Sequence, residues 1–208
     1  MDPAPVSQSV GGIVLCGGRS SRMGRPKLTL RFGNEPMLAR VVRILRTTVN
    51  PVVVVAAPGQ EVPPLPSDVR ILRDEHEHLG PLAGMSVGLQ ALAGEVEAAF
   101  VTSCDVPLLM PEFIAEMIRR LSGHELAVPK EGDFHHPLAA VYRTSLAERA
   151  SQLVAAQRLR PLFLIQASDS VEVSVDELRA VDPELQSLRN LNRPEDYEAA
   201  LRLAGLVE

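Results

Sequence analysis

Short apolar runs alternate with amphipathic stretches along the first half of the chain. Four of these runs have the length and β-branched content of buried strands, namely 10–16, 52–55, 69–72 and 98–103. Between them, apolar residues recur at helical spacing after Pro36, from about Leu82 and after Pro111. This order predicts an α/β fold of three layers, Rossmann-like, in which a mostly parallel sheet carries helices on both faces.

The second half of the chain is less regular. Its pattern predicts strands at 126–129, 137–142 and 171–175, and helices at about 144–156, 161–167 and 194–203. We expect residues 1–9 to form a flexible N-terminus and residues 10–208 to form a single domain.

Composition narrows the class of protein. Apolar residues make up 46% of the 208 residues, which is enough for a sizeable core. Aromatic residues make up only 3%, so stacking on single-stranded nucleic acid is not expected. No window has the apolar length of a membrane span, and the first ten residues do not resemble a signal peptide. We therefore expect a cytoplasmic protein with neither a nucleic acid nor a membrane as partner.

Positive charge is concentrated in one stretch of an acidic chain. The net charge is −5, yet residues 19–34 contain five cations and no acid. Gly17, Gly18 and Gly24 lie in or beside this stretch, in a loop that follows the first strand. Glycines let backbone N–H groups approach a ligand closely, so the loop is typical of a site for a small anion such as a phosphate.

Two common phosphate-binding motifs do not fit this loop. A P-loop requires Lys directly after its second Gly, whereas Gly24 is followed by Arg25. The dinucleotide motif requires a second Gly two residues after the first, which Gly17-Gly18-Arg19 does not provide. Arg22 and Lys27 remain the cations best suited to clamp phosphate oxygens and to stabilise charge that develops during phosphoryl or nucleotidyl transfer.

Polar side chains follow the ends of the predicted strands. Cys16, Asp74 and Asp105 each lie at such an end, where the ligands of open parallel sheets bind. Asp105 follows a buried apolar strand, and a carboxylate there fits a Mg²⁺ ion shared with substrate phosphates. A turn cap is the alternative role for Asp105.

Cysteine and histidine give weaker signals. The two cysteines, Cys16 and Cys104, form no disulfide framework, which is typical of a reducing compartment. We expect them to be neighbours in the sheet, either as two inert buried thiols or as an oxidant-sensitive pair. The histidines, including His76 and His78, match no zinc-ligand spacing.

Five motifs in order resemble those of the molybdenum cofactor guanylyltransferase family, within the nucleotidyltransferase superfamily. They are LCGGRSSRMGRPK from Leu15, GPLAG from Gly80, TSCDVPLL from Thr102, HPLAAVYR from His136 and NLNRPEDY from Asn190. Two positions depart from the family pattern. Cys16 replaces the usual Ala, and Val55 lies where some members have an Asn that contacts the nucleotide.

The resemblance implies transfer of GMP from GTP to the terminal phosphate of Mo-molybdopterin, with Mg²⁺ and release of pyrophosphate. It implies a nucleotide-binding half at 10–123 and an acceptor-binding half at 124–208. Catalysis is expected from Arg22, Lys27 and Asp105, the last also binding the metal. The nucleotide would contact Leu15, Cys16, Gly17, Gly18, Lys27, Asp74, Gly80, Leu82 and Asp105. The acceptor would contact His136, Asn190 and Asn192.

Other functions remain open on the sequence alone. Within enzymes, the alternatives are CTP-dependent cytidylyl transfer to the same cofactor and NTP-dependent activation of another small molecule. Outside enzymes, the chain could be a nucleotide-binding carrier of the cofactor. The resemblance also allows contacts with other cofactor-biosynthesis proteins and with molybdoenzymes.

Overall fold

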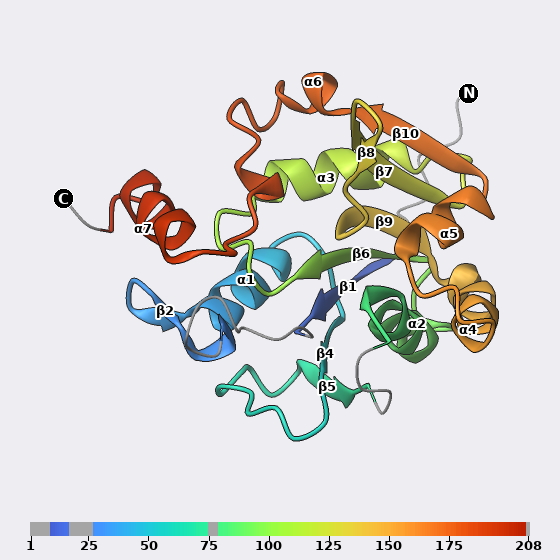
Figure 1. Ribbon diagram of the computed structural model, residues 1–208, viewed down its shortest axis with the longest axis horizontal. Helices are drawn as coiled ribbons and strands as arrows, with labels where there is room; N and C mark the ends of the chain where they lie inside the picture. The colour runs from blue at the N-terminus through green and yellow to red at the C-terminus, as the bar shows by residue number, and fades with distance from the viewer. Residues whose placement is uncertain (1–8, 17–26, 75–78, 207–208) are drawn as a thin grey trace, which may run out of the picture.

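The computed structural model describes residues 9–16, 27–74 and 79–206. Its centre is an eight-stranded sheet in the order β10-β7-β9-β6-β1-β4-β5, with β8 paired to β7 (Figure 1). The strands are β1 (Val10–Leu15), β4 (Val52–Ala56), β5 (Arg70–Arg73), β6 (Ala98–Ser103), β7 (Leu126–Glu131), β8 (Phe134–His135), β9 (Ala139–Arg143) and β10 (Ser170–Ser174).

Most neighbouring strands are parallel. The pairs β6–β1, β1–β4, β4–β5 and β7–β10 are parallel, whereas β9 runs antiparallel to both β6 and β7. The predicted α/β fold with a mostly parallel sheet is therefore confirmed. The strand predicted at 69–72 lies one residue later, and the one predicted at 137–142 begins at Ala139.

Helices cover both faces of the sheet, as the sequence predicts. One face carries α1 (Met37–Leu45), α3 (Pro111–Arg120) and α6 (Val175–Leu178). The other carries α2 (Pro81–Leu92), α4 (Ala147–Ala155) and α5 (Pro161–Gln166). Strand residues alternate between the two cores because successive side chains point to opposite faces. In β1, Val14 packs with the first group and Ile13 with the second.

The second face depends on a close approach of helix and strand. A Cβ on Gly88 of α2 would lie 2.7 Å from Cγ2 of Ile13 in β1. Real Cβ atoms essentially never make a contact that short, so glycine is what lets α2 pack this tightly against the central strand.

A smaller unit was not predicted from the sequence. The strands β2 (Arg31–Phe32) and β3 (Glu35–Pro36) form an antiparallel hairpin just after the 3₁₀ helix η1 (Lys27–Thr29). The last helix, α7 (Pro194–Leu203), packs on this hairpin through a third apolar cluster. Two further 3₁₀ helices, η2 (Thr144–Leu146) and η3 (Gln186–Leu188), complete the described elements. None of the described helices has both the length and the apolar character needed to cross a bilayer.

Candidate active site

The carboxyl ends of β1 and β6 meet at one edge of the sheet. The register pairs Leu15 with Ser103, and the amide of Cys104 donates to the carbonyl of Leu15 at 3.0 Å. Cys16 continues the pairing on the other side by donating to the carbonyl of Val55 at 2.8 Å. The chain therefore leaves the two central strands side by side, which confirms the predicted proximity of Cys16 and Cys104.

Asp105 lies at this edge and is only 8% exposed. Its Oδ1 accepts hydrogen bonds from the hydroxyl of Ser103 at 2.5 Å and from the side-chain amide of Asn190 at 3.1 Å. Its backbone carbonyl accepts from the amide of Leu191 at 2.9 Å. The predicted metal ligand and a predicted acceptor residue are thus in direct contact, although they are far apart in the chain.

The two side-chain donors described for Asp105 are compatible with a shared metal ion. Ser103 and Asn190 are neutral donors, so these two bonds orient the carboxylate without cancelling its charge. Mg²⁺ commonly binds one or two protein carboxylates and takes its other ligands from water and substrate phosphates. Among the described residues, no three His, Cys, Asp or Glu side chains gather to enclose a metal. An ion bound by Asp105 would take its remaining ligands from water and substrate phosphates, as Mg²⁺ commonly does.

The predicted nucleotide contacts gather on the β1–β4–β5 side of Asp105. A Cβ on Gly84 of α2 would lie 3.3 Å from Leu15 and 3.9 Å from the carboxylate of Asp74, so these groups surround the first turns of α2. Gly80 precedes this helix with a φ of 74°, a conformation that favours glycine. Leu82 is fully buried, side chain and backbone alike, so its contact with the nucleotide stays a prediction.

The start of α2 has the electrostatics of an anion site. Pro81 occupies the first turn, that turn contains no acid, and no side chain in the described part of the chain caps the helix. The first N–H groups of a helix have no partners within the helix and carry partial positive charge, which favours oxygen atoms of a ligand.

The predicted acceptor residues come from two segments. His136 follows β8, and its amide donates to the carbonyl of Pro129 at 2.9 Å. Asn192 is exposed just before α7, and its backbone amide donates to the carboxylate of Asp196 at 3.0 Å. Asn190 is therefore the acceptor residue whose side chain is held at Asp105, while these contacts hold His136 and Asn192 in their own segments.

Part of the predicted phosphate loop lies outside the described residues. This holds for Gly17, Gly18 and Arg22, and of Lys27 only the backbone in η1 is described. Their roles remain predictions. His76 and His78 also lie outside the described residues.

The thiol of Cys16 is poorly ionised. A hydrogen bond with Cys104, then burial, raises the pKa of Cys16 well above its ordinary value, and the charge of Asp105 acts in the same direction. Because the thiolate is the reactive form, this environment favours the interpretation of Cys16 as an inert buried thiol.

Two residues at the site escaped the sequence analysis. Ser103 is the last residue of β6 and belongs to the same TSCDVPLL motif as Asp105, so its role had a detectable signal. Arg40 lies on the polar side of α1, away from the buried apolar residues of this helix. Its guanidinium donates to the carbonyl of Pro107 at 2.7 Å, just beyond Asp105, and this contact had no local signal.

Known proteins are similar to this chain in sequence and in fold. Residues 12–171 match the model of the family described as "MobA-like NTP transferase domain". The "Probable molybdenum cofactor guanylyltransferase" of Mycobacterium tuberculosis strain H37Rv is 40% identical over 204 residues, with 96% of each chain covered. A protein of the same name from Mycobacterium avium strain 104 is 40% identical over 198 residues, covering 93% of this chain and 95% of that protein.

Solved structures have the same fold. Molybdopterin-guanine dinucleotide biosynthesis protein A from Archaeoglobus fulgidus superposes with a TM-score of 0.78 at 22% identity, covering 95% of this chain and all of that one. The 2-C-methyl-D-erythritol 4-phosphate cytidylyltransferase of Thermus thermophilus gives 0.67 at 19% identity, covering 95% and 98%. At these identities the likeness concerns the fold alone.

Proposed function

The chain belongs to the family of MobA-like NTP transferase domains and is a nucleotidyltransferase, and from this premise we propose that it transfers GMP from GTP to the terminal phosphate of Mo-molybdopterin. The products are molybdopterin guanine dinucleotide and pyrophosphate. The observation that carries the proposal is the contact of Asp105 with Asn190. It joins the residue proposed to hold the metal with a residue proposed to bind the acceptor, at the edge where both substrates must meet.

The reaction needs no nucleophilic side chain. An oxygen of the acceptor phosphate attacks the α-phosphorus of GTP, a new P–O bond forms, and the bond to the β-phosphate oxygen breaks as pyrophosphate leaves. The protein therefore acts by positioning and by stabilising charge. This division of labour fits a site built from a carboxylate, an amide and backbone N–H groups.

Each residue of the site has a role in this scheme. Asp105 would hold Mg²⁺, which supplies charge compensation between two anionic substrates. Ser103 and Asn190 fix the carboxylate through its Oδ1. The start of α2 and Asp74 would bind the nucleotide. Arg22 and Lys27 of the loop would stabilise the negative charge of the leaving pyrophosphate.

Guanine selection is proposed to rest on backbone groups near Gly80–Leu82. Val55 is buried in β4, so no amide side chain reaches the nucleotide from that strand position. The start of α2 offers N–H donors instead, which suit the carbonyl oxygen of guanine.

The experiment is to measure pyrophosphate release from ATP, CTP, GTP and UTP, with and without Mo-molybdopterin, in the presence of Mg²⁺. Of the four nucleotides, we expect only GTP to release pyrophosphate, and only when the acceptor is present. Release from CTP would instead identify a cytidylyltransferase. Binding of GTP without any release would identify a carrier.

A pair of variants tests the role of the carboxylate. Asp105→Asn keeps the shape of the side chain and removes its charge, so we expect turnover to be lost. Asp176→Asn is the matched control, because the side chain of Asp176 on α6 is 85% exposed. Near-normal turnover of Asp105→Asn would rule out the metal role.

A further inference from the structure

The hairpin of β7 and β8 exposes an aromatic side chain on the half of the sheet beyond β6. Phe134 is 64% exposed, more than any other large apolar side chain among the described residues. Its ring meets the ring of His136 edge to face, with centroids 4.9 Å apart and planes at 84°. The contact leaves one face of the phenylalanine ring open as a flat apolar surface for a ligand.

Three side chains share one face of this hairpin. Glu131 is paired with Phe134 in the register, and His136 follows two residues later, so all three point to the same side. We call Glu131, Phe134 and His136 the hairpin face. The carboxylate of Glu131 is 65% exposed and lies 3.8 Å from Nε2 of His136. Burial of the ring lowers the pKa of His136, while the neighbouring carboxylate of Glu131 acts in the opposite direction.

The opposite side of the hairpin holds it in place. Lys130 and His135 both bind the carboxylate of Glu172 on β10, at 2.6 and 2.7 Å. After the hairpin, the hydroxyl of Tyr142 donates to the carbonyl of Pro137 at 2.9 Å. The hairpin face is thus presented by a braced element. Figure 1 shows β8 and β10 beside β7.

The hairpin face lies on the acceptor side of Asp105. The sheet order places β9 and then β7 next to β6, so about 10 Å, two strand spacings, separates β7 from β6. The nucleotide contacts lie in the other direction, toward β4 and β5. Odd-numbered positions of β7 face the same core as Leu185 and Leu188, which precede Asn190, so the hairpin face and the Asn190 segment share one side of the sheet.

We propose that the hairpin face binds the pterin ring of the acceptor, with Phe134 stacking on the ring and Glu131 accepting hydrogen bonds from its 2-amino-pyrimidinone edge. His136 supports Phe134 through the contact between their rings. An aromatic face beside a carboxylate matches both the flat ring and the paired N–H donors of a pterin. This inference rests on the proposed function, because the acceptor phosphate must sit at Asp105 for the ring to reach β8.

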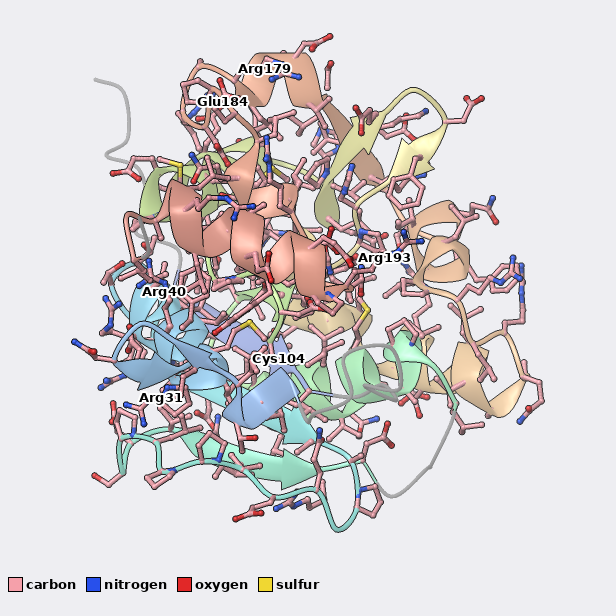
Figure 2. All side chains as sticks on the ribbon, turned by 60° about the vertical axis from the view of Figure 1, so that its left-hand side comes forward. Arg31, Arg40, Cys104, Arg179, Glu184 and Arg193 are labelled. Atoms are coloured by element: carbon pink, nitrogen blue, oxygen red, sulfur yellow. The ribbon has the colours of Figure 1, made fainter. Side chains whose placement is uncertain are left out.

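Kinetics of two variants test the proposal in the intact protein. Phe134→Ala should raise the KM for molybdopterin by about 5- to 150-fold for the lost stacking. Glu131→Gln should raise the same KM because the charged acceptor of the ring's hydrogen bonds is lost. The KM for GTP and the kcat at saturating acceptor should stay within about twofold, and Phe134→Tyr should restore the wild-type KM. The controls are Leu162→Ala, an exposed apolar residue of α5, and Glu184→Gln, which lies beside Arg179 and far from Cys104 in Figure 2.

Direct binding separates this proposal from the proposed reaction. Titration with 6-hydroxymethylpterin, followed by the ring's own fluorescence, needs neither GTP nor turnover. Weaker binding by Phe134→Ala and Glu131→Gln, but not by the controls, supports the hairpin face even if another nucleotide proves to be the donor. Unchanged pterin binding and unchanged KM in both variants, in a protein that transfers GMP, would overturn the inference and leave the proposed function intact.

Discussion

The side-chain amide of Asn190 donates to the carboxylate of Asp105 at 3.1 Å, across 85 positions of sequence. The same amide lies 3.3 Å from the hydroxyl of Ser103, which itself donates to Asp105. The three side chains form a closed triangle at the end of β6. Its geometry depends on the long segment after α6 returning to the sheet edge, where Leu191 is anchored to the backbone carbonyl of Asp105.

The first prediction concerns this triangle. Asn190→Ala should lower kcat by about 10- to 150-fold, because a hydrogen bond to a charged group contributes about 1.5–3 kcal/mol. Ser103→Ala should have a similar effect on kcat. In the double variant, the increase in activation free energy should be smaller than the sum for the two single variants, since both donors bind the same oxygen. Steady-state GMP transfer measures all three, with Asn34→Ala in the turn between β2 and β3 as control. Strictly additive losses would mean that the two donors act independently.

The sequence predicted the sheet and its helices because these depend on local patterns. The apolar run of β1 predicts a buried strand, and the helical spacing after Pro36 predicts α1, without knowledge of distant residues. The β2–β3 hairpin escaped because two-residue strands carry no periodicity. The direction of β9 escaped because a short apolar run does not encode its orientation.

The sequence predicted which residues belong to the site, but it did not predict which of them touch one another. Asp105 and Asn190 were each recognised from motifs, but nothing local to either indicates that they touch. Arg40 was the opposite case, since the polar side of an amphipathic helix gives no sign of which cation will reach a distant carbonyl. Contacts of high sequence separation are products of the tertiary fold.

A second prediction concerns acid stability. The hydrogen bond from Arg119, helped by that from Arg120, lowers the pKa of Glu116 on α3 from 4.5 to about 2. A lowered pKa in the folded state stabilises the protein above pH 4.5, and this stabilisation is lost as the pH falls from 4.5 to about 2. Because the side chain of Arg119 is 66% exposed, solvent screening limits the effect to about 1 kcal/mol.

Urea unfolding of Glu116→Gln and of the wild type, measured over a range of pH, tests this pH-dependent stabilisation. The difference in the free energy of unfolding should be largest near pH 7 and should shrink between pH 4.5 and about 2. Glu198→Gln, an exposed glutamate of α7, serves as control and should show no such trend. A difference that stays constant with pH would mean that the arginines do not act through the charge of Glu116.

A third prediction concerns the two cysteines. Since the pKa of Cys16 is raised and both thiols are buried, each should react slowly with a disulfide reagent near neutral pH. Both should react promptly once the protein is unfolded in guanidinium chloride. Peroxide should leave the activity and the thiol count unchanged. Loss of two thiols together with activity would establish the alternative, an oxidant-sensitive pair.

The last prediction concerns Arg40, which connects three parts of the site. Its guanidinium donates to the carbonyl of Pro107 and lies over the ring of Phe32 at 4.9 Å. It also lies 3.7 Å from Glu35. Phe32 in turn packs against α7, where the hydroxyl of Tyr197 donates to the carbonyl of Arg31. Figure 2 shows Arg31 and Arg40 together on one side of Cys104.

Arg40 therefore ties the turn that follows Asp105 to the hairpin that follows the glycine loop. Arg40→Ala should lower kcat by about tenfold or more, the equivalent of one hydrogen bond of about 1.5 kcal/mol at the lower limit for a charged donor. Arg40→Lys should recover only part of the loss, because an ammonium group lacks the planar fork that both donates to a carbonyl and stacks on a ring.

Arg43→Ala is the matched control for this effect. Arg43 lies on the same helix, binds the same Glu35 at 2.7 and 3.2 Å, and has a side chain that is 57% exposed. Its bonds are to Glu35 and not to Pro107, so its loss should change stability slightly and kcat by less than about twofold. Hydrogen exchange then locates the cause, since amides near 105–109 should exchange faster in Arg40→Ala alone. Equal exchange rates and equal kcat values in the two variants would contradict this prediction. They would show that Arg40 acts only through its ion pair with Glu35, which Arg43 also makes.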